Sequence, residues 1–266
     1  MQRSHSVAKR YDSPEGQLGS VIFNGHMHLG YWDTEPADTT YAQAAAKFTD
    51  IMVGKTRIQP GQRFCDLGCG CGEPAIALAK TKHCFVEGVT LSEFQQQDAL
   101  KRAKSAGVAD KTRFIVGDVL ATPFPAESFD GGWFFESIFH MGHQPALLAA
   151  QRMLKSDAYL IIADLTLLPT VTEDFLVYAK DNIHADFIAA HDYPKLLNAC
   201  GFELIELDNI SEYVMPHLVP TIKSTIADHE QLILNTVGAD IINETIKSYQ
   251  LMSEHLDYVL VTARKK

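Results

Sequence analysis

Hydrophobic positions along the chain follow two alternating periods, one typical of strands and one typical of helices. Short apolar runs are separated by longer segments whose apolar residues recur at helical spacing. Because strands that alternate with helices build parallel, doubly wound sheets, this pattern predicts an α/β fold with its ligand at the carboxyl ends of the strands. The predicted strands lie near 64–67, 84–90, 113–116, 129–135, 158–165, 202–207 and 258–262.

Three segments depart from this alternation. Residues 166–190 and 211–250 are too long for simple connections and carry apolar stripes at helical spacing, while residues 1–40 gather His, Tyr and Trp side chains in a Gly-containing stretch. We expect a single domain over residues 1–266, in which 1–40 forms a lid and the two insertions roof a substrate pocket. Ordinary packing of the same side chains against the core is the alternative interpretation.

The stretch 64–76 predicts a strand, a glycine-rich turn and a helix. Gly68, Gly70 and Gly72 allow positive φ angles and close approach of a ligand to the backbone. The N-terminus of the following helix offers free N–H groups that favour an anionic group such as a carboxylate. A dinucleotide fingerprint would need a small residue at position 73, where the chain has Glu73, so the turn favours another ligand.

Composition narrows the classes of partner. The formal net charge is −10 and Lys and Arg form no run, which argues against nucleic acid as the main substrate. No apolar run is long enough to span a membrane and the first residues lack a signal-peptide core, so we expect a cytoplasmic protein. The five cysteines lack a C-x2-C unit, and small thiols filling tight space are favoured over a zinc site.

Four motifs in chain order resemble those of class I S-adenosylmethionine (SAM) methyltransferases. Residues 66–72 match the D-x-G-x-G-x-G turn that faces the methionine part of SAM, and 88–92 match a G-[IV]-T-L-S subgroup in which the threonine, the next residue and a nearby glutamine help to hold SAM. Asp118 stands where the family binds the adenine amino group, and 136–141 match its E-S-x-x-H-M segment. The resemblance implies a Rossmann-like sheet with helical lid insertions. It also implies a set of cofactor-binding residues: Tyr31, Asp66, Gly68, Gly70, Gly72, Thr90, Leu91, Gln95, Asp118, Val119 and Glu136.

Over nearly the whole chain the likeness is to small-molecule, natural-product methyltransferases, such as the rebeccamycin sugar O-methyltransferase and, more distantly, the tocopherol methyltransferases. The sugar enzyme carries two adjacent histidines after strand 4 and an aspartate at the end of strand 5. Here those positions hold Phe139, His140 and Asp164. The resemblance therefore implies His140 as general base, which Asp164 would orient. The alternatives are a His140 that merely bonds backbone and an Asp164 that is solvated at a strand end.

Methyl transfer to an alcohol requires alignment of the nucleophile and removal of its proton, a role that suits a histidine near neutral pH. We expect an O-methyltransferase that releases S-adenosylhomocysteine, needs no metal and acts on a small, largely apolar secondary metabolite. An N- or C-methyltransferase of the same fold, or a protein that holds SAM while catalysing another reaction, are the alternatives. The sequence is compatible with a homo-oligomer and does not identify the acceptor.

Overall fold

The computed structural model describes residues 2–33 and 39–266, and its centre is a seven-stranded sheet in the order β3-β2-β1-β4-β5-β7-β6. All neighbouring strands pair in parallel except β7, which runs antiparallel to both β5 and β6. The predicted doubly wound α/β fold is therefore confirmed, but the last strand reverses direction. The strands are β1 (Arg63–Leu67), β2 (Phe85–Thr90), β3 (Thr112–Val116), β4 (Phe129–Phe135), β5 (Leu154–Leu167), β6 (Phe202–Asn209) and β7 (Leu256–Lys265).

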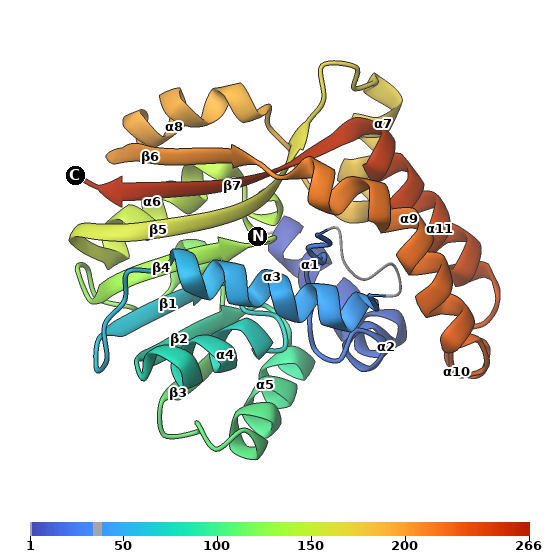
Figure 1. The fold of residues 1–266 in the computed structure, drawn as a ribbon, viewed down its shortest axis with the longest axis horizontal. Coiled ribbons are helices and arrows are strands. Elements are labelled where there is room, and N and C mark those ends of the chain that lie inside the picture. The colour runs from blue at the N-terminus through green and yellow to red at the C-terminus, as the bar shows by residue number, and fades with distance from the viewer. Residues whose placement is uncertain (1, 34–38) are drawn as a thin grey trace.

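Helices cover both faces of the sheet (Figure 1). One face packs α3 (Tyr41–Lys55), α4 (Glu73–Lys82) and α5 (Glu93–Ser105) over a core that includes Phe64 and Trp133. The other face packs α6 (His143–Met153) and α8 (Tyr193–Ala199) over a second core. Both cores are apolar and buried. Because the central strands are covered on both faces, most of their residues are hydrophobic.

The remaining helices gather beyond the carboxyl ends of the parallel strands (Figure 1). Isoleucines of the predicted stripes form a separate apolar cluster there, together with Leu18 of the N-terminal segment. That segment is helical, which the sequence pattern did not predict, and residues 34–38 of the expected lid lie outside the described residues. The elements at this end are α1 (Gln2–Asp12), α2 (Pro14–Ile22), α7 (Glu173–Tyr178), a π-helix (Ala179–Ile183), α9 (Ser211–Asp228), α10 (Glu230–Thr236) and α11 (Asp240–His255).

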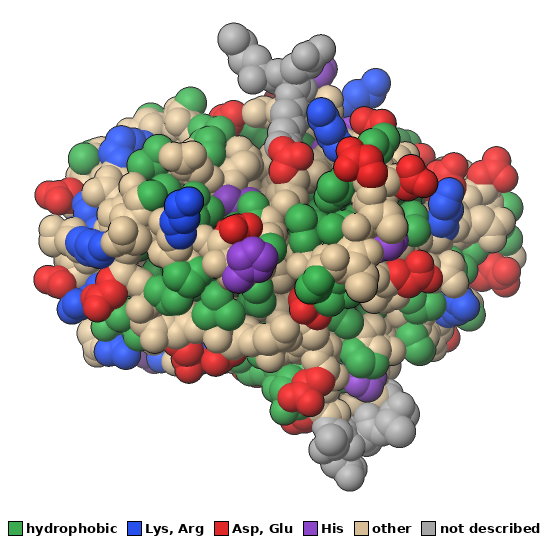
Figure 2. Space-filling model, turned by 90° about the horizontal axis from the view of Figure 1, so that it is seen from above, with side chains coloured by type: hydrophobic (Ala, Val, Ile, Leu, Met, Phe, Trp, Pro, Cys, Tyr) green, Lys and Arg blue, Asp and Glu red, His purple; other side chains and the backbone are tan. Residues whose placement is uncertain are grey.

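The surface fits the acidic composition. On the face seen in Figure 2, Lys and Arg side chains are interspersed with Asp and Glu side chains rather than gathered in a patch. Within residues 2–33 and 39–266, none of the helices has the length and apolar character needed to span a membrane. The five cysteines are free and buried, and burial raises the pKa of Cys65, Cys69 and Cys71. These thiols fill space, as expected.

Candidate active site

A cavity of about 210 Å³ lies where β1, β2 and β4 end. It brings together nine of the eleven residues that the sequence motifs assigned to cofactor binding, although these residues span some seventy positions of the chain. The nine are Asp66, Gly68, Gly70, Thr90, Leu91, Gln95, Asp118, Val119 and Glu136.

The glycine turn forms the floor of this cavity. Gly68 and Gly70 line it with φ angles of +100° and +51°. Gly72 does not line it: a Cβ at Gly72 would stand 2.9 Å from Ala99 Cβ and from the Phe114 ring. The first two glycines therefore expose backbone to a ligand, whereas Gly72 is required by the packing of α4 against α5 and β3.

Asp66 is the next-to-last residue of β1 and lines the cavity. It is 1% exposed, and its Oδ2 atom has no hydrogen-bond partner among the described residues. Burial raises the pKa of Asp66 to about 7. A buried carboxylate oxygen without a partner is costly in the empty site. It suits a ligand that brings a positive charge, such as the ammonium group of SAM.

The side chains after β2 are tied into one hydrogen-bonded unit. Thr90 Oγ1 donates to Gln95 Oε1 at 2.7 Å, and the Ser92 hydroxyl accepts from the Gln95 N–H at 3.0 Å. Ser92 and Gln95 therefore form only half of a capping box, because the Gln95 side-chain amide accepts from Thr90 and not from the Ser92 N–H. Ser92 Oγ also donates to Asp12 Oδ1 at 2.5 Å, which attaches α1 to the start of α5.

Asp118 follows β3 and faces α1. Its Oδ1 accepts from the Leu120 N–H at 2.9 Å, and its Oδ2 accepts from Ser4 Oγ at 2.7 Å. Ser4 and Val7 of α1 also line the cavity. The N-terminal helix thus supplies a hydroxyl to the carboxylate that the sequence motif assigns to the adenine amino group.

Tyr31 is the other predicted cofactor contact that lies elsewhere. Its ring stacks on Tyr213 at a centroid distance of 4.8 Å and does not line the cavity. Trp32, 5% exposed, packs near Tyr41. Of residues 28–32 in the expected lid, only His28 lines this cavity, and its ring stacks on Phe135 at a centroid distance of 3.8 Å.

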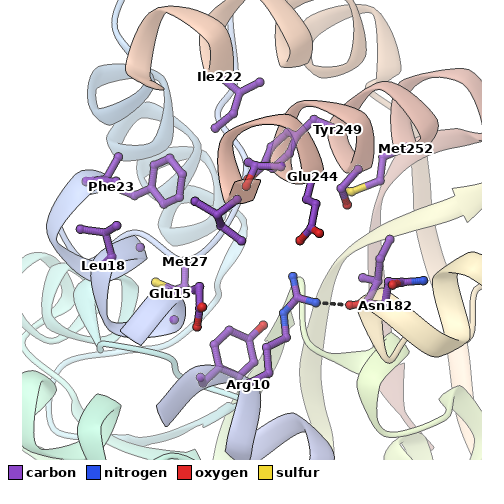
Figure 3. A pocket seen from close by; sticks show the side chains of 18 of the residues that line it. Arg10, Glu15, Leu18, Phe23, Met27, Asn182, Ile222, Glu244, Tyr249 and Met252 are labelled. Atoms are coloured by element: carbon purple, nitrogen blue, oxygen red, sulfur yellow. Dashed lines mark hydrogen bonds between the residues drawn. The ribbon is translucent and has the colours of Figure 1, made fainter. Parts of the chain in front are cut away.

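A second, larger cavity of about 670 Å³ lies among α1, α2, α9, α10 and α11 (Figure 3). Charged side chains help to line it, including Arg10, Glu15, Glu244 and Lys247. Arg10 donates to the Asn182 carbonyl, and the Arg10 and Glu244 side chains point toward one another (Figure 3). Its interior is largely apolar. The apolar lining residues include Leu18, Ile22, Phe23, Phe139, Leu165, Ile183, Phe187, Ile222, Ile226, Ile233, Ile242 and Met252.

The two cavities share a wall made of Tyr11, Met27, His28, Glu136 and His140. Sequence reasoning assigned no role to Tyr11 or Met27. Any group passed from a ligand in one cavity to a ligand in the other has to cross this wall.

Glu136 reaches the shared wall from a strained backbone. It directly follows β4 with a φ of +49°, uncommon for a residue with a Cβ. Its Oε1 accepts from the Tyr258 hydroxyl at 2.6 Å and from the Leu29 N–H at 2.7 Å. Burial raises the pKa of Glu136 to about 8, so this carboxyl is mostly protonated at neutral pH.

His140 ends the short 3₁₀ turn that follows Glu136. Its Nδ1 lies 3.0 Å from the carbonyl oxygen of His184, directly after the π-helix. A carbonyl oxygen only accepts, so Nδ1 carries the hydrogen of the neutral ring and Nε2 has the lone pair. Nε2 lies 3.2 Å from the Tyr11 hydroxyl, which donates to it.

Asp164 is not placed beside His140. Its Oδ2 accepts from Nε2 of His143 at 2.8 Å and from the Tyr193 hydroxyl at 2.6 Å. Asp164 is fully buried and lines neither of the two cavities. It points to the sheet face covered by α6 and α8. The prediction that Asp164 orients His140 is therefore wrong, because the Asp164 carboxylate bonds His143 instead. Alternation of Asp164 with Leu160 and Ile162, which belong to the core on that face, is the signal that could have revealed this.

Comparison with known proteins agrees with this geometry. A methyltransferase-domain family model matches residues 65–162. The 27-O-demethylrifamycin SV methyltransferase of Amycolatopsis mediterranei is 30% identical over 98% of this chain and 97% of its own. The (+)-O-methylkolavelool synthase of Herpetosiphon aurantiacus is 29% identical over 99% and 95% of the two chains.

Solved structures extend the likeness. The [4+2]-cyclase SpnF superimposes with a TM-score of 0.85 at 25% identity, over 98% of this chain and 96% of that one. A geranyl diphosphate methyltransferase bound to sinefungin shares the fold, with a TM-score of 0.80 at 19% identity over 99% and 100% of the chains. Fold and site thus define a class I methyltransferase. The chain belongs to the family of SAM-dependent methyltransferases, among relatives that act in secondary metabolism.

Proposed function

We propose that the protein transfers a methyl group from SAM to a hydroxyl oxygen of a largely apolar natural product, with His140 as general base. The observation that carries this proposal is the shared wall, where the predicted cofactor cavity meets the large apolar cavity at His140, Glu136 and Tyr11. The names of two relatives, a 27-O-demethylrifamycin SV methyltransferase and an O-methylkolavelool synthase, support an oxygen nucleophile.

The residues present suit SAM. Asp66, whose Oδ2 has no hydrogen-bond partner among the described residues, would hold the ammonium group of SAM, and the Gly68–Gly70 backbone would hold its carboxylate. The Thr90–Gln95 unit would hold the ribose, and Asp118 would hold the adenine amino group. When bound, SAM supplies a methyl group on a positively charged sulfur. His28 stays neutral because burial lowers its pKa to about 3, so the shared wall adds no positive charge from that ring.

The apolar cavity sets the class of acceptor. A molecule that fills it buries hydrocarbon against the isoleucines of α9 and α11 and places one polar group at the shared wall. A highly charged acceptor would lose its hydration among these side chains, at a cost of several kcal/mol. We therefore propose an apolar alcohol rather than a phosphosugar or nucleotide.

We further propose that no divalent metal takes part. Among residues 2–33 and 39–266, no three His, Cys, Asp or Glu side chains are grouped so that they could hold a metal ion. Alignment of the acceptor and removal of its proton by a side chain are sufficient for transfer from a sulfonium.

The test is methyl transfer to kolavelool and to 27-O-demethylrifamycin SV, with glucose 6-phosphate as the charged comparison. At least one apolar alcohol should be methylated, and His140→Asn should lower kcat by roughly 10²–10⁴-fold, the usual contribution of a general base. His191→Asn is the matched control, because the His191 side chain is 86% exposed. Full activity of His140→Asn, or methylation of the phosphosugar alone, would contradict the proposal.

A further inference from the structure

Tyr11 belongs to the N-terminal helix α1, far in sequence from the motifs that form the two cavities, yet its side chain stands in their shared wall. Its hydroxyl lies 3.2 Å from Nε2 of His140, and the two rings meet edge to face at a centroid distance of 6.0 Å. The base of the proposed function and the phenol bonded to it therefore stand side by side in the shared wall.

The direction of the hydrogen bond follows from the other side of the imidazole ring. Nδ1 faces the carbonyl oxygen of His184 at 3.0 Å, so the ring donates there and accepts at Nε2. The Tyr11 hydroxyl is thus the donor to Nε2, and its oxygen can still accept a hydrogen bond. An acceptor alcohol at the shared wall can donate a hydrogen bond to the Tyr11 oxygen, and the Tyr11 hydroxyl in turn donates to His140 Nε2, which can take up a proton.

Tyr11 is held in this position from both sides. Arg10, the preceding residue, donates to the carbonyl of Asn182 in the π-helix, and Asp12, the following residue, accepts from the Ser92 hydroxyl and the Phe94 N–H. Burial raises the pKa of the Tyr11 phenol, so it is protonated at neutral pH and does not itself serve as the final base. A neutral phenol between an alcohol and an imidazole has the chemistry of a proton relay.

We propose that Tyr11 is a catalytic residue that passes the proton of the acceptor hydroxyl to His140; this inference rests on the proposed function. As the acceptor oxygen bonds to the methyl carbon, the carbon–sulfur bonding electrons leave with the sulfur. The acceptor proton moves to the Tyr11 oxygen, and the Tyr11 proton moves to Nε2 of His140. Tyr11 ends neutral, the imidazole ends positively charged, and the proton leaves it for solvent after the product departs.

An acceptor-free measurement tests the hydrogen bond itself. In the full-length protein with ¹⁵N-labelled histidine, Nε2 of His140 should resonate as an unprotonated nitrogen that accepts a hydrogen bond. In Tyr11→Phe this resonance should move downfield, as expected when the donor is lost. In Tyr213→Phe, which removes a hydroxyl outside both cavities, it should stay in place. An unchanged resonance in Tyr11→Phe would overturn the relay.

The solvent isotope effect on the rate of methyl transfer shows how many protons move in the transition state. With kolavelool as acceptor, the single-turnover rate is measured in mixtures of light and heavy water. The plot of this rate against the fraction of heavy water should be curved, because two protons are transferred; a single proton would give a straight line. Tyr11→Phe should transfer methyl about tenfold or more slowly, within the range of proton-transfer catalysis. A linear dependence in the wild-type protein, or wild-type rates for Tyr11→Phe beside an inactive His140→Asn, overturns the relay alone. An active His140→Asn instead contradicts the proposed function.

Discussion

Replacing Gly70 by alanine should weaken SAM binding while the protein stays folded. Gly70 has a φ of +51°, and a Cβ there would stand 3.2 Å from Cβ and Cγ of Met27. A left-handed backbone costs a residue with a Cβ roughly 1–2 kcal/mol, and the flexible Met27 side chain can yield by a few tenths of an ångström. The expected loss in the free energy of unfolding is therefore about 1–2 kcal/mol.

Gly61→Ala is the matched control. Gly61 has a φ of +79° at the amino end of β1, away from the cavity, and a Cβ there would meet no atom within 4 Å. Both variants should lose similar stability in urea unfolding, because both place alanine in a left-handed conformation. Only the methyl group at position 70 enters the cofactor cavity.

Isothermal titration calorimetry with SAM separates the two effects. Gly70→Ala should bind SAM at least tenfold more weakly, a loss of about 1.4 kcal/mol, whereas Gly61→Ala should bind like the wild-type protein. If Gly70→Ala binds SAM with unchanged affinity, the glycine turn does not receive the cofactor. Equal weakening in both variants would mean that lost stability, not cavity shape, governs binding.

Three further predictions follow from the site. Burial raises the pKa of Asp66 to about 7 and that of Glu136 to about 8, so the folded protein keeps protons that the unfolded chain releases. Burial lowers the pKa of His26 to about 4 and that of His28 to about 3, which opposes this effect below about pH 6.5. Stability should therefore fall as the pH rises from about 6.5 to 8, and Glu136→Gln should flatten that fall in urea melts; stability that rises over this range would refute the assignment. Ser4→Ala removes the hydroxyl that donates to the Asp118 carboxylate, and the variant should bind SAM about 3–10-fold more tightly by calorimetry. Weaker binding would mean that Ser4 contacts the ligand itself. Methyl transfer should persist in EDTA, and loss of activity that Mg²⁺ restores would show a metal requirement.

The sheet and the glycine turn could be predicted from sequence because they rest on local signals. Alternating periods located the strands, and the motif spacing located nine residues that the fold brings to one cavity. The N-terminal helices could not be found in this way. Helix α1 is mostly polar, and among its residues with described side chains only Val7 is fully buried, so its contacts with Asp118, Ser92 and His140 are tertiary.

The choice between two histidines also lies beyond local sequence. His140 and His143 are three residues apart at the same strand end, and only the orientation of α6 against the sheet decides which of them meets Asp164. The sequence motif paired Asp164 with His140, whereas in the fold Asp164 bonds His143. The partners of His140 are the His184 carbonyl and the Tyr11 hydroxyl. A role for Tyr11 depends on the same tertiary placement, since residue 11 is 129 positions away from its partner.

The position of the transferred methyl group tests the central claim most directly. The protein is incubated with SAM that carries a ¹³C methyl group and with kolavelool, and the product is examined by ¹³C NMR while S-adenosylhomocysteine is quantified. Our account predicts a labelled methoxy carbon and one S-adenosylhomocysteine for each product molecule. A label on carbon, or a product formed without consumption of SAM, would contradict it.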